Sequence, residues 1–146
     1  MKCWSVAILL VPLLSVPAYA AGDPAVGATV FNKCKACHAA GPGATNRVGP
    51  VLNDVVGRVA GTFEGYSYSD ALKAAGAAGL VWTPDVLAKW LAKPKGLVPA
   101  TKMSFPGLTD QADIDNVVAY LISVSPNYQA ADGARAPATS SSSAVQ

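Results

Sequence analysis

The sequence predicts an all-α domain that spans residues 21–125. Three observations support this fold class: segments with helix caps and apolar residues at helical spacing, Gly- and Pro-rich stretches between them, and no sustained alternation of apolar and polar residues. The chain has 146 residues, of which 51% are hydrophobic and 14% are charged. This composition is enough for one compact core, so we expect a single-domain monomer.

Residues 1–20 precede this domain and have the pattern of a secretory signal peptide. Lys2 gives a positive start, residues 4–16 are apolar, and an Ala-Tyr-Ala cleavage site ends at Ala20. The apolar stretch is shorter than the ~18 residues that a membrane-spanning helix needs, and Pro12 interrupts it. We therefore expect export, cleavage near Ala20 and no stable membrane anchor.

The first predicted helix begins at Asp23, where an Asp-Pro pair provides an N-cap and a first-turn proline. This helix leads to Cys34. A shorter helix is predicted from Ser69 or Asp70 to Gly76.

Two longer helices follow in the second half of the domain. The first of them begins at Thr83, again before a proline, and Pro94 ends it. The last helix begins at Thr109 or Asp110, and Pro126 stops it. Its apolar residues recur at i, i+3, i+4, i+7 and i+8, which predicts an amphipathic helix: they are Ile114, Val117, Val118, Leu121 and Ile122.

Residues 126–146 form a tail that is rich in Ala, Ser and Pro and has almost no large apolar side chains. Such a segment buries too little apolar surface to offset the entropy lost on ordering. The composition therefore predicts a disordered tail.

Cys34, Cys37 and His38 form a Cys-x-x-Cys-His motif after the first predicted helix. The two thiols lie within one helical turn and can each add across a haem vinyl group, and the histidine is placed to bind the iron. Cys3 lies in the predicted signal peptide, so Cys34 and Cys37 are the two cysteines of the mature chain. The motif predicts one covalently attached haem c with His38 as an axial ligand.

Other uses of a Cys-x-x-Cys pair fit this sequence less well. A structural zinc ion needs about four ligands, whereas the mature chain offers two cysteines and one histidine, all within residues 34–38. A thioredoxin-like redox pair belongs in a βαβ context, and the flanking segments here are helix and loop. A structural disulfide between Cys34 and Cys37 is the remaining alternative.

Met103 is the candidate for the sixth iron ligand. Met1 belongs to the predicted signal peptide, so Met103 is the one methionine of the mature chain, and it lies in a loop between Pro99 and Pro106. A thioether ligand favours ferrous iron and raises the potential of electron-transfer haems. If Met103 does not bind, the open position suits a haem enzyme or a gas-binding protein with a displaceable sixth ligand.

The overall charge argues against nucleic acid as a partner. The formal net charge is only +2, and one of the positive charges, Lys2, lies in the predicted signal peptide. A haem would add two propionate carboxylates, so the mature protein has no excess of positive charge to attract a phosphate backbone.

With these residues in place, the chain resembles the class I monohaem cytochromes c, which include soluble bacterial periplasmic cytochromes c and mitochondrial cytochrome c. The resemblance runs from about Gly22 to Ser125. Besides the haem motif, it includes five blocks in the family's order: Gly49-Pro50-Val51-Leu52, Gly57-Arg58-Val59-Ala60-Gly61, Gly65-Tyr66-Ser67-Tyr68-Ser69, Trp82 and Thr101-Lys102-Met103-Ser104-Phe105. It implies the cytochrome c fold, in which helices pack around one haem. It also implies that the first and last helices touch through four residues: Gly27, Phe31, Tyr120 and Leu121.

The resemblance also assigns roles to residues around the haem. The Pro50 carbonyl would accept a hydrogen bond from the ring of His38 and orient it. Four further residues would contact the haem propionates through hydrogen bonds or charge: Arg58, Tyr68, Trp82 and Thr101.

The function that the resemblance implies is that of a soluble periplasmic electron carrier, not an enzyme. In this fold five lysines bracket the exposed haem edge, where they would steer docking of redox proteins or membrane complexes: Lys33, Lys35, Lys93, Lys95 and Lys102. Acidic residues gather in the C-terminal region, so we expect a dipolar molecule: they are Asp110, Asp113, Asp115 and Asp132.

Overall fold

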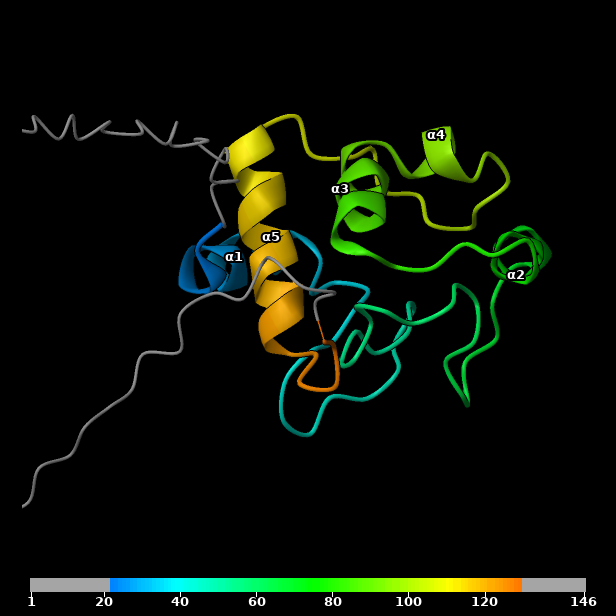
Figure 1. Cartoon of the computed structure of the whole chain (residues 1–146), viewed down its shortest axis with the longest axis horizontal. Coiled ribbons are helices and arrows are strands. Elements are labelled where there is room, and N and C mark those ends of the chain that lie inside the picture. The colour runs from blue at the N-terminus through cyan, green and yellow to red at the C-terminus, as the bar shows by residue number, and fades with distance from the viewer. Residues whose placement is uncertain (1–21, 130–146) are drawn as a thin grey trace, which may run out of the picture.

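The computed structural model describes residues 22–129, and its helices confirm the all-α prediction (Figure 1). In chain order the elements are α1 (Pro24–Val30), the 3-10 turn η1 (Phe31–Lys33), α2 (Asp70–Ala77), α3 (Pro84–Ala92), α4 (Pro94–Leu97) and α5 (Gln111–Ser123). Within the described residues, β pairing is limited to an isolated bridge between Val59 and Val81. No helix in this part of the chain is long and apolar enough to cross a membrane. The predicted signal peptide and residues 130–146 of the predicted tail lie outside the described residues.

Each of the four predicted helices begins at a predicted cap. The Asp23 carboxylate accepts hydrogen bonds from two N–H groups in the first turn of α1. The side chains of Ser69, Thr83 and Asp110 each accept one such bond at α2, α3 and α5. A cap of this kind stabilises a protein by about 1 kcal/mol. Pro94 has a role that the sequence did not predict, because α3 ends before it and Pro94 itself begins the short helix α4.

Helices α1 and α5 cross in close contact on one side of the molecule (Figure 1). Gly27 faces the α5 backbone, where a Cβ atom would overlap the Asn116 carbonyl oxygen and lie 2.8 Å from the Cβ of Tyr120. Phe31 is 1% exposed and packs on the Tyr120 ring, with the ring centroids 5.1 Å apart. The contact that was predicted between the first and last helices is therefore present, and the missing side chain of Gly27 makes it possible.

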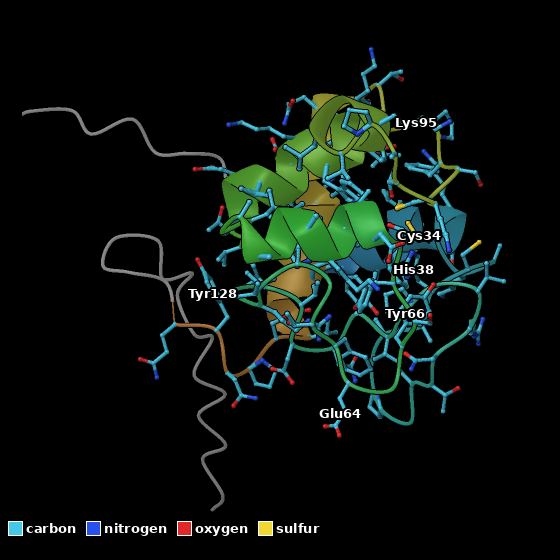
Figure 2. All side chains as sticks on the ribbon, turned by 90° about the vertical axis from the view of Figure 1, so that its right-hand side faces the viewer. Cys34, His38, Glu64, Tyr66, Lys95 and Tyr128 are labelled. Atoms are coloured by element: carbon cyan, nitrogen blue, oxygen red, sulfur yellow. The ribbon has the colours of Figure 1, made fainter. Side chains whose placement is uncertain are left out.

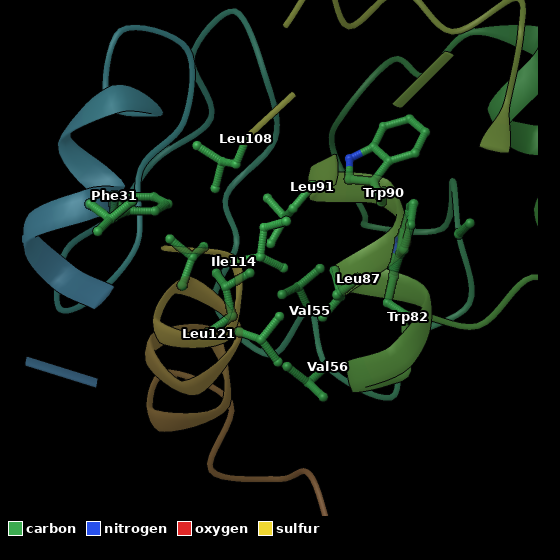
Figure 3. Close-up of a cluster of buried hydrophobic side chains, with 14 of the residues drawn as sticks. Phe31, Val55, Val56, Trp82, Leu87, Trp90, Leu91, Leu108, Ile114 and Leu121 are labelled. Carbon is green, nitrogen blue, oxygen red and sulfur yellow. The ribbon is translucent and has the colours of Figure 1, made fainter. Parts of the chain in front are cut away.

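The hydrophobic core lies between α5, α3 and the loop segment that contains Val55 and Val56 (Figure 3). Helix α5 contributes most of its predicted apolar face to this core: Ile114, Val117, Val118 and Leu121. Ile122 is the exception, since it is 38% exposed. In the part of the core that faces α3, Trp90 meets Trp82 edge-on, with ring centroids 5.1 Å apart. These contacts join the two halves of the chain around one core.

The packed part of the chain extends beyond the boundary predicted after Ser125. Asn127 forms two hydrogen bonds with Asp54, and the half-buried Tyr128 packs against the core. Tyr128 supplies the large apolar side chain that the rest of the predicted tail lacks. Residues 126–129 therefore belong to the folded domain.

We predict that Gly27→Ala lowers the free energy of unfolding by about 1–3 kcal/mol, because the added methyl group overlaps the α5 backbone. Urea denaturation of the intact protein measures the change. Val26→Ala is the matched control on the same helix, since Val26 is 46% exposed, and it should change stability by less than about 0.5 kcal/mol. Wild-type stability of Gly27→Ala would contradict this view of the α1–α5 contact.

Candidate functional site

Cys34, Cys37 and His38 lie on one tight turn directly after η1. The N–H groups of Cys37 and His38 both donate to the Cys34 carbonyl oxygen, at 3.0 and 2.9 Å. Both cysteines are free, with Cys34 half-buried and Cys37 exposed. Burial raises the pKa of the Cys34 thiol. Figure 2 shows Cys34 and His38 next to each other on one side of the molecule, so this turn presents thiols and an imidazole from one place.

The ring of His38 is held by the Pro50 carbonyl oxygen, which lies 2.8 Å from His38 Nδ1. Because a carbonyl oxygen only accepts hydrogen bonds, Nδ1 carries the ring proton, and Nε2 keeps its lone pair for a metal ion. Burial lowers the pKa of His38, and the bond to Pro50 opposes this shift only in part. The imidazole is therefore neutral and oriented, which is the form that binds metals.

Gly49 lies against the face of the same ring and is itself buried. A Cβ atom on Gly49 would lie 2.7 Å from Nδ1 and 2.8 Å from Nε2 of His38, distances that no real side chain allows. The N–H of Gly49 donates to the Cys37 carbonyl oxygen at 2.7 Å. We call residues 39–51, which contain Gly49 and Pro50, the ring-holding loop. No role was predicted for Gly49, although a glycine directly before the ring-binding proline was a usable signal.

Two side chains tie the ring-holding loop to its surroundings. Asn46 Oδ1 accepts a bond from the Val51 N–H at 2.9 Å, and its Nδ2 donates to the Gly65 carbonyl oxygen at 3.1 Å. The Tyr66 hydroxyl donates to the Val48 carbonyl oxygen at 2.6 Å, and Tyr66 lies on the same side of the molecule as the motif (Figure 2). The bond between Asn46 and Val51 lies within the ring-holding loop. Sequence reasoning missed the other two bonds, since each joins a side chain to a backbone group of another loop.

Arg58 and Tyr68 are near enough for the charge of each to act on the other. Burial lowers the pKa of Arg58 and raises that of Tyr68, and the attraction between the two opposes both shifts. The Arg58 guanidinium donates to the Asn53 carbonyl oxygen at 3.2 Å and lies 4.7 Å from the centroid of the Phe63 ring. This half-buried guanidinium beside a phenol hydroxyl suits a carboxylate ligand.

Trp82 is joined to this pair through the backbone. Its N–H donates to the Arg58 carbonyl oxygen at 2.9 Å, and its own carbonyl oxygen accepts from the Gly57 N–H at 2.9 Å. The indole is 7% exposed. The structure thus brings Arg58 next to both Tyr68 and Trp82.

Met103 and Thr101 lie in the loop between α4 and α5. The Thr101 hydroxyl oxygen accepts a hydrogen bond from the Met103 N–H at 3.2 Å, and the Thr101 N–H donates to the Val98 carbonyl oxygen at 3.0 Å. Met103 is half-buried and packs against the core. These contacts order the backbone around the thioether.

All five lysines expected at the haem edge are exposed, but Lys33 is paired. Its Nζ donates to the Asp113 carboxylate at 2.8 Å, and this bond raises the pKa of Lys33. Because α1 crosses α5, Asp113 lies beside the motif and not at a distance from it. The expected separation of positive and negative charge is therefore wrong for this pair. Lys33 was placed on the positive side and Asp113 on the negative side, but the two side chains are bonded to each other. Lys95 lies on α4 and is labelled in Figure 2.

Comparison with known proteins decides the family. Residues 24–125 match the family profile described as cytochrome c. The chain belongs to the cytochrome c family. It is 50% identical to cytochrome c2 of Agrobacterium tumefaciens (strain II Chrys) over 101 residues, which cover 69% of this chain and 91% of that protein. It is 53% identical to cytochrome c-550 of Ancylobacter novellus over 98 residues, which cover 67% of this chain and 92% of the relative. A solved structure of cytochrome c2 from Rhodospirillum centenum matches with a TM-score of 0.69 at 44% identity, over 72% of this chain and 100% of that one.

Membership in this family means that the cytochrome carries one covalently bound haem c, and the residues of the site fit that group. The Cys34–Cys37 turn offers two free thiols, and His38 offers a neutral imidazole with Nε2 available. Arg58 offers a charge partner for carboxylates. The described part of the chain holds no group of three or more His, Cys, Asp or Glu side chains that would bind a metal ion alone.

We predict that Gly49→Ala loosens the His38 ring, because the added methyl group occupies the space of the imidazole. The Nδ1 proton of His38 should exchange with solvent about fivefold to tenfold faster, as expected when its bond to Pro50 weakens. NMR of the haem-loaded protein measures this rate. Thr45→Ala, an exposed position in the same loop, is the matched control. An unchanged exchange rate in Gly49→Ala would show that Gly49 does not hold the ring.

Proposed function

We propose that this cytochrome is a soluble periplasmic carrier that shuttles single electrons between redox partners through a haem c ligated by His38 and Met103. The observation that carries the proposal is the 2.8 Å hydrogen bond between His38 and the Pro50 carbonyl, which leaves Nε2 of a neutral ring free to bind iron. The relatives named cytochrome c2 and cytochrome c-550 support the same class of function.

The residues of this chain would hold the haem in four places. Cys34 and Cys37 would form thioether bonds to its vinyl groups, and His38 and Met103 would bind its iron. When bound, the haem supplies an iron that takes up or releases one electron. The Pro50 carbonyl keeps the imidazole in one orientation, and the core packs against the methionine. Both ligands then stay in place in either oxidation state, so little movement accompanies electron transfer.

The haem propionates would lie against Arg58, Tyr68, Trp82 and Thr101. An ionised carboxylate in a half-buried region is strongly unfavourable unless charged or hydrogen-bonding groups meet it. Arg58 supplies the positive charge, and the hydroxyl and indole groups supply hydrogen-bond donors. Their partial burial strengthens these interactions relative to those in water.

Redox partners would dock at four exposed lysines around the haem edge: Lys35, Lys93, Lys95 and Lys102. Their charges steer encounters with acidic surfaces on redox proteins or membrane complexes, and added salt weakens that steering. Lys33 contributes less because Asp113 already pairs with it. Such a carrier works as a monomer after export and cleavage near Ala20.

We predict that Met103→Ala opens the iron to added ligands. The ferric variant should lose the weak far-red absorption band of methionine-ligated haem and bind cyanide, and the ferrous variant should bind carbon monoxide. Absorption spectroscopy with stopped-flow mixing measures both effects. Ser104→Ala, an exposed neighbour, should behave like the wild type.

Two results would contradict this ligand assignment. Ligand-binding rates that are equal in Met103→Ala and in the wild type would mean that Met103 is not an axial ligand. A wild-type protein that lacks the far-red band at neutral pH and binds carbon monoxide readily would favour a haem enzyme or a gas-binding protein.

A further inference from the structure

Three residues at and beyond the end of α5 contact the loop of residues 54–58, and we call them the C-terminal clasp: Ser125, Asn127 and Tyr128. The Val56 N–H donates to Ser125 Oγ at 3.2 Å. Asp54 Oδ1 accepts two bonds from Asn127, one from the side-chain amide at 3.0 Å and one from the backbone N–H at 3.4 Å. Side chains that follow the end of α5 thus hold this loop through hydrogen bonds.

Tyr128 adds an apolar contact to these bonds. Its ring carbon Cδ2 lies 3.1 Å from the place where a Cβ atom on Gly57 would stand, and Gly57 has a φ of +83° that favours glycine. The Tyr128 N–H donates to the Ser125 carbonyl oxygen at 2.9 Å. Figure 2 shows Tyr128 on the side of the molecule opposite to Cys34 and His38. The clasp therefore acts on the loop from the side away from the haem motif.

Asp54 is the point in this loop where the backbone needs support. With a φ of +54°, it is the one non-glycine residue with a left-handed backbone among residues 22–129. A side chain in that conformation is unfavourable by about 1 kcal/mol or more. The Asp54 N–H donates to the Val124 carbonyl oxygen at 3.0 Å, and its carboxylate meets Asn127. The end of α5 and the clasp together keep Asp54 in this conformation.

The clasped loop leads directly to two of the residues assigned to the haem propionates. Gly57 and Arg58 form backbone hydrogen bonds of 2.9 Å with Trp82. The Asp54 carboxylate also acts on the Arg58 charge, since it opposes the lowering of the Arg58 pKa that burial causes. An open hollow of about 450 Å³ is lined by Arg58 together with Asp54, Asn127 and Tyr128. If the clasp releases the loop, the Arg58 side chain has free space to turn toward this hollow and water.

We propose that the C-terminal clasp positions Arg58 and Trp82 and thereby raises the reduction potential of the haem. The proposal rests on the proposed function, in which Arg58 faces the haem propionates. A guanidinium held near the propionates offsets their negative charge, which otherwise stabilises the more positive ferric iron. Loss of the clasp lets Arg58 move into water, so the ferric form gains and the potential falls.

Asn127→Ala in the full-length, haem-loaded protein tests the proposal. We expect a lower midpoint potential and about threefold to tenfold faster amide hydrogen exchange at Asp54 and Gly57, because the loop opens more often. Tyr128→Ala should act in the same direction, whereas Tyr128→Phe keeps the ring and should match the wild type. Gln129→Ala is the matched control, since Gln129 is an exposed neighbour of the clasp. Spectroelectrochemistry and hydrogen-exchange mass spectrometry supply the two readouts.

Arg58→Ala, alone and combined with Asn127→Ala, separates this proposal from the proposed function. We expect Arg58→Ala to lower the potential and to remove any further effect of Asn127→Ala, because the clasp acts through Arg58. If Arg58→Ala lowers the potential and Asn127→Ala does not, the clasp proposal is wrong and the role of Arg58 stands. If Arg58→Ala leaves the potential unchanged, the role of Arg58 in the proposed function is wrong, and the clasp proposal fails with it. Equal effects of Asn127→Ala in both backgrounds would also contradict the clasp proposal.

Discussion

The hydrogen bond from His38 to the Pro50 carbonyl is the interaction on which the rest of the site depends. It selects the tautomer of the ring and orients Nε2. Burial, and not this bond, lowers the pKa of His38 and keeps the imidazole neutral. A free histidine on a loop would rotate about two side-chain bonds and lose this direction. Gly49 makes the bond possible, because only a residue without a side chain leaves the ring its place against the backbone. The ring-holding loop is therefore as much a part of the haem site as the motif itself.

The helices act as a frame that brings separate segments of the chain to this site. The crossing of α1 and α5 fixes the start of the motif, since η1 follows α1 directly and Lys33 pairs with Asp113 of α5. The edge-on contact of Trp82 with Trp90 ties α3 to the loop that carries Arg58. Helices α1, α3 and α5 bury apolar side chains in one core, and this burial is the main source of stability in a domain of this size. The polar groups of the site lie at the border of that core.

Local signals in the sequence predicted the helices and the placement of the two cysteines and the histidine on one turn, because both features depend on neighbouring residues. Caps at Asp23, Ser69, Thr83 and Asp110 need only the next turn of chain, and the cysteine and histidine spacing needs one turn. Contacts between distant segments were not predictable in this way. The bond of Asn127 to Asp54, the pairing of Lys33 and the approach of Gly49 to His38 depend on how the helices cross. Several roles came instead from resemblance to relatives, as for Arg58 and Trp82.

We have proposed that His38 and Met103 both bind the haem iron in the ferric and the ferrous protein. A redox titration of the purified, exported protein, followed by visible absorption spectroscopy, is the decisive test of this ligation. We expect a single reversible one-electron transition between two six-coordinate, low-spin spectra, because both ligands would be held by the protein in either state. A five-coordinate, high-spin spectrum at either end of the titration would contradict it.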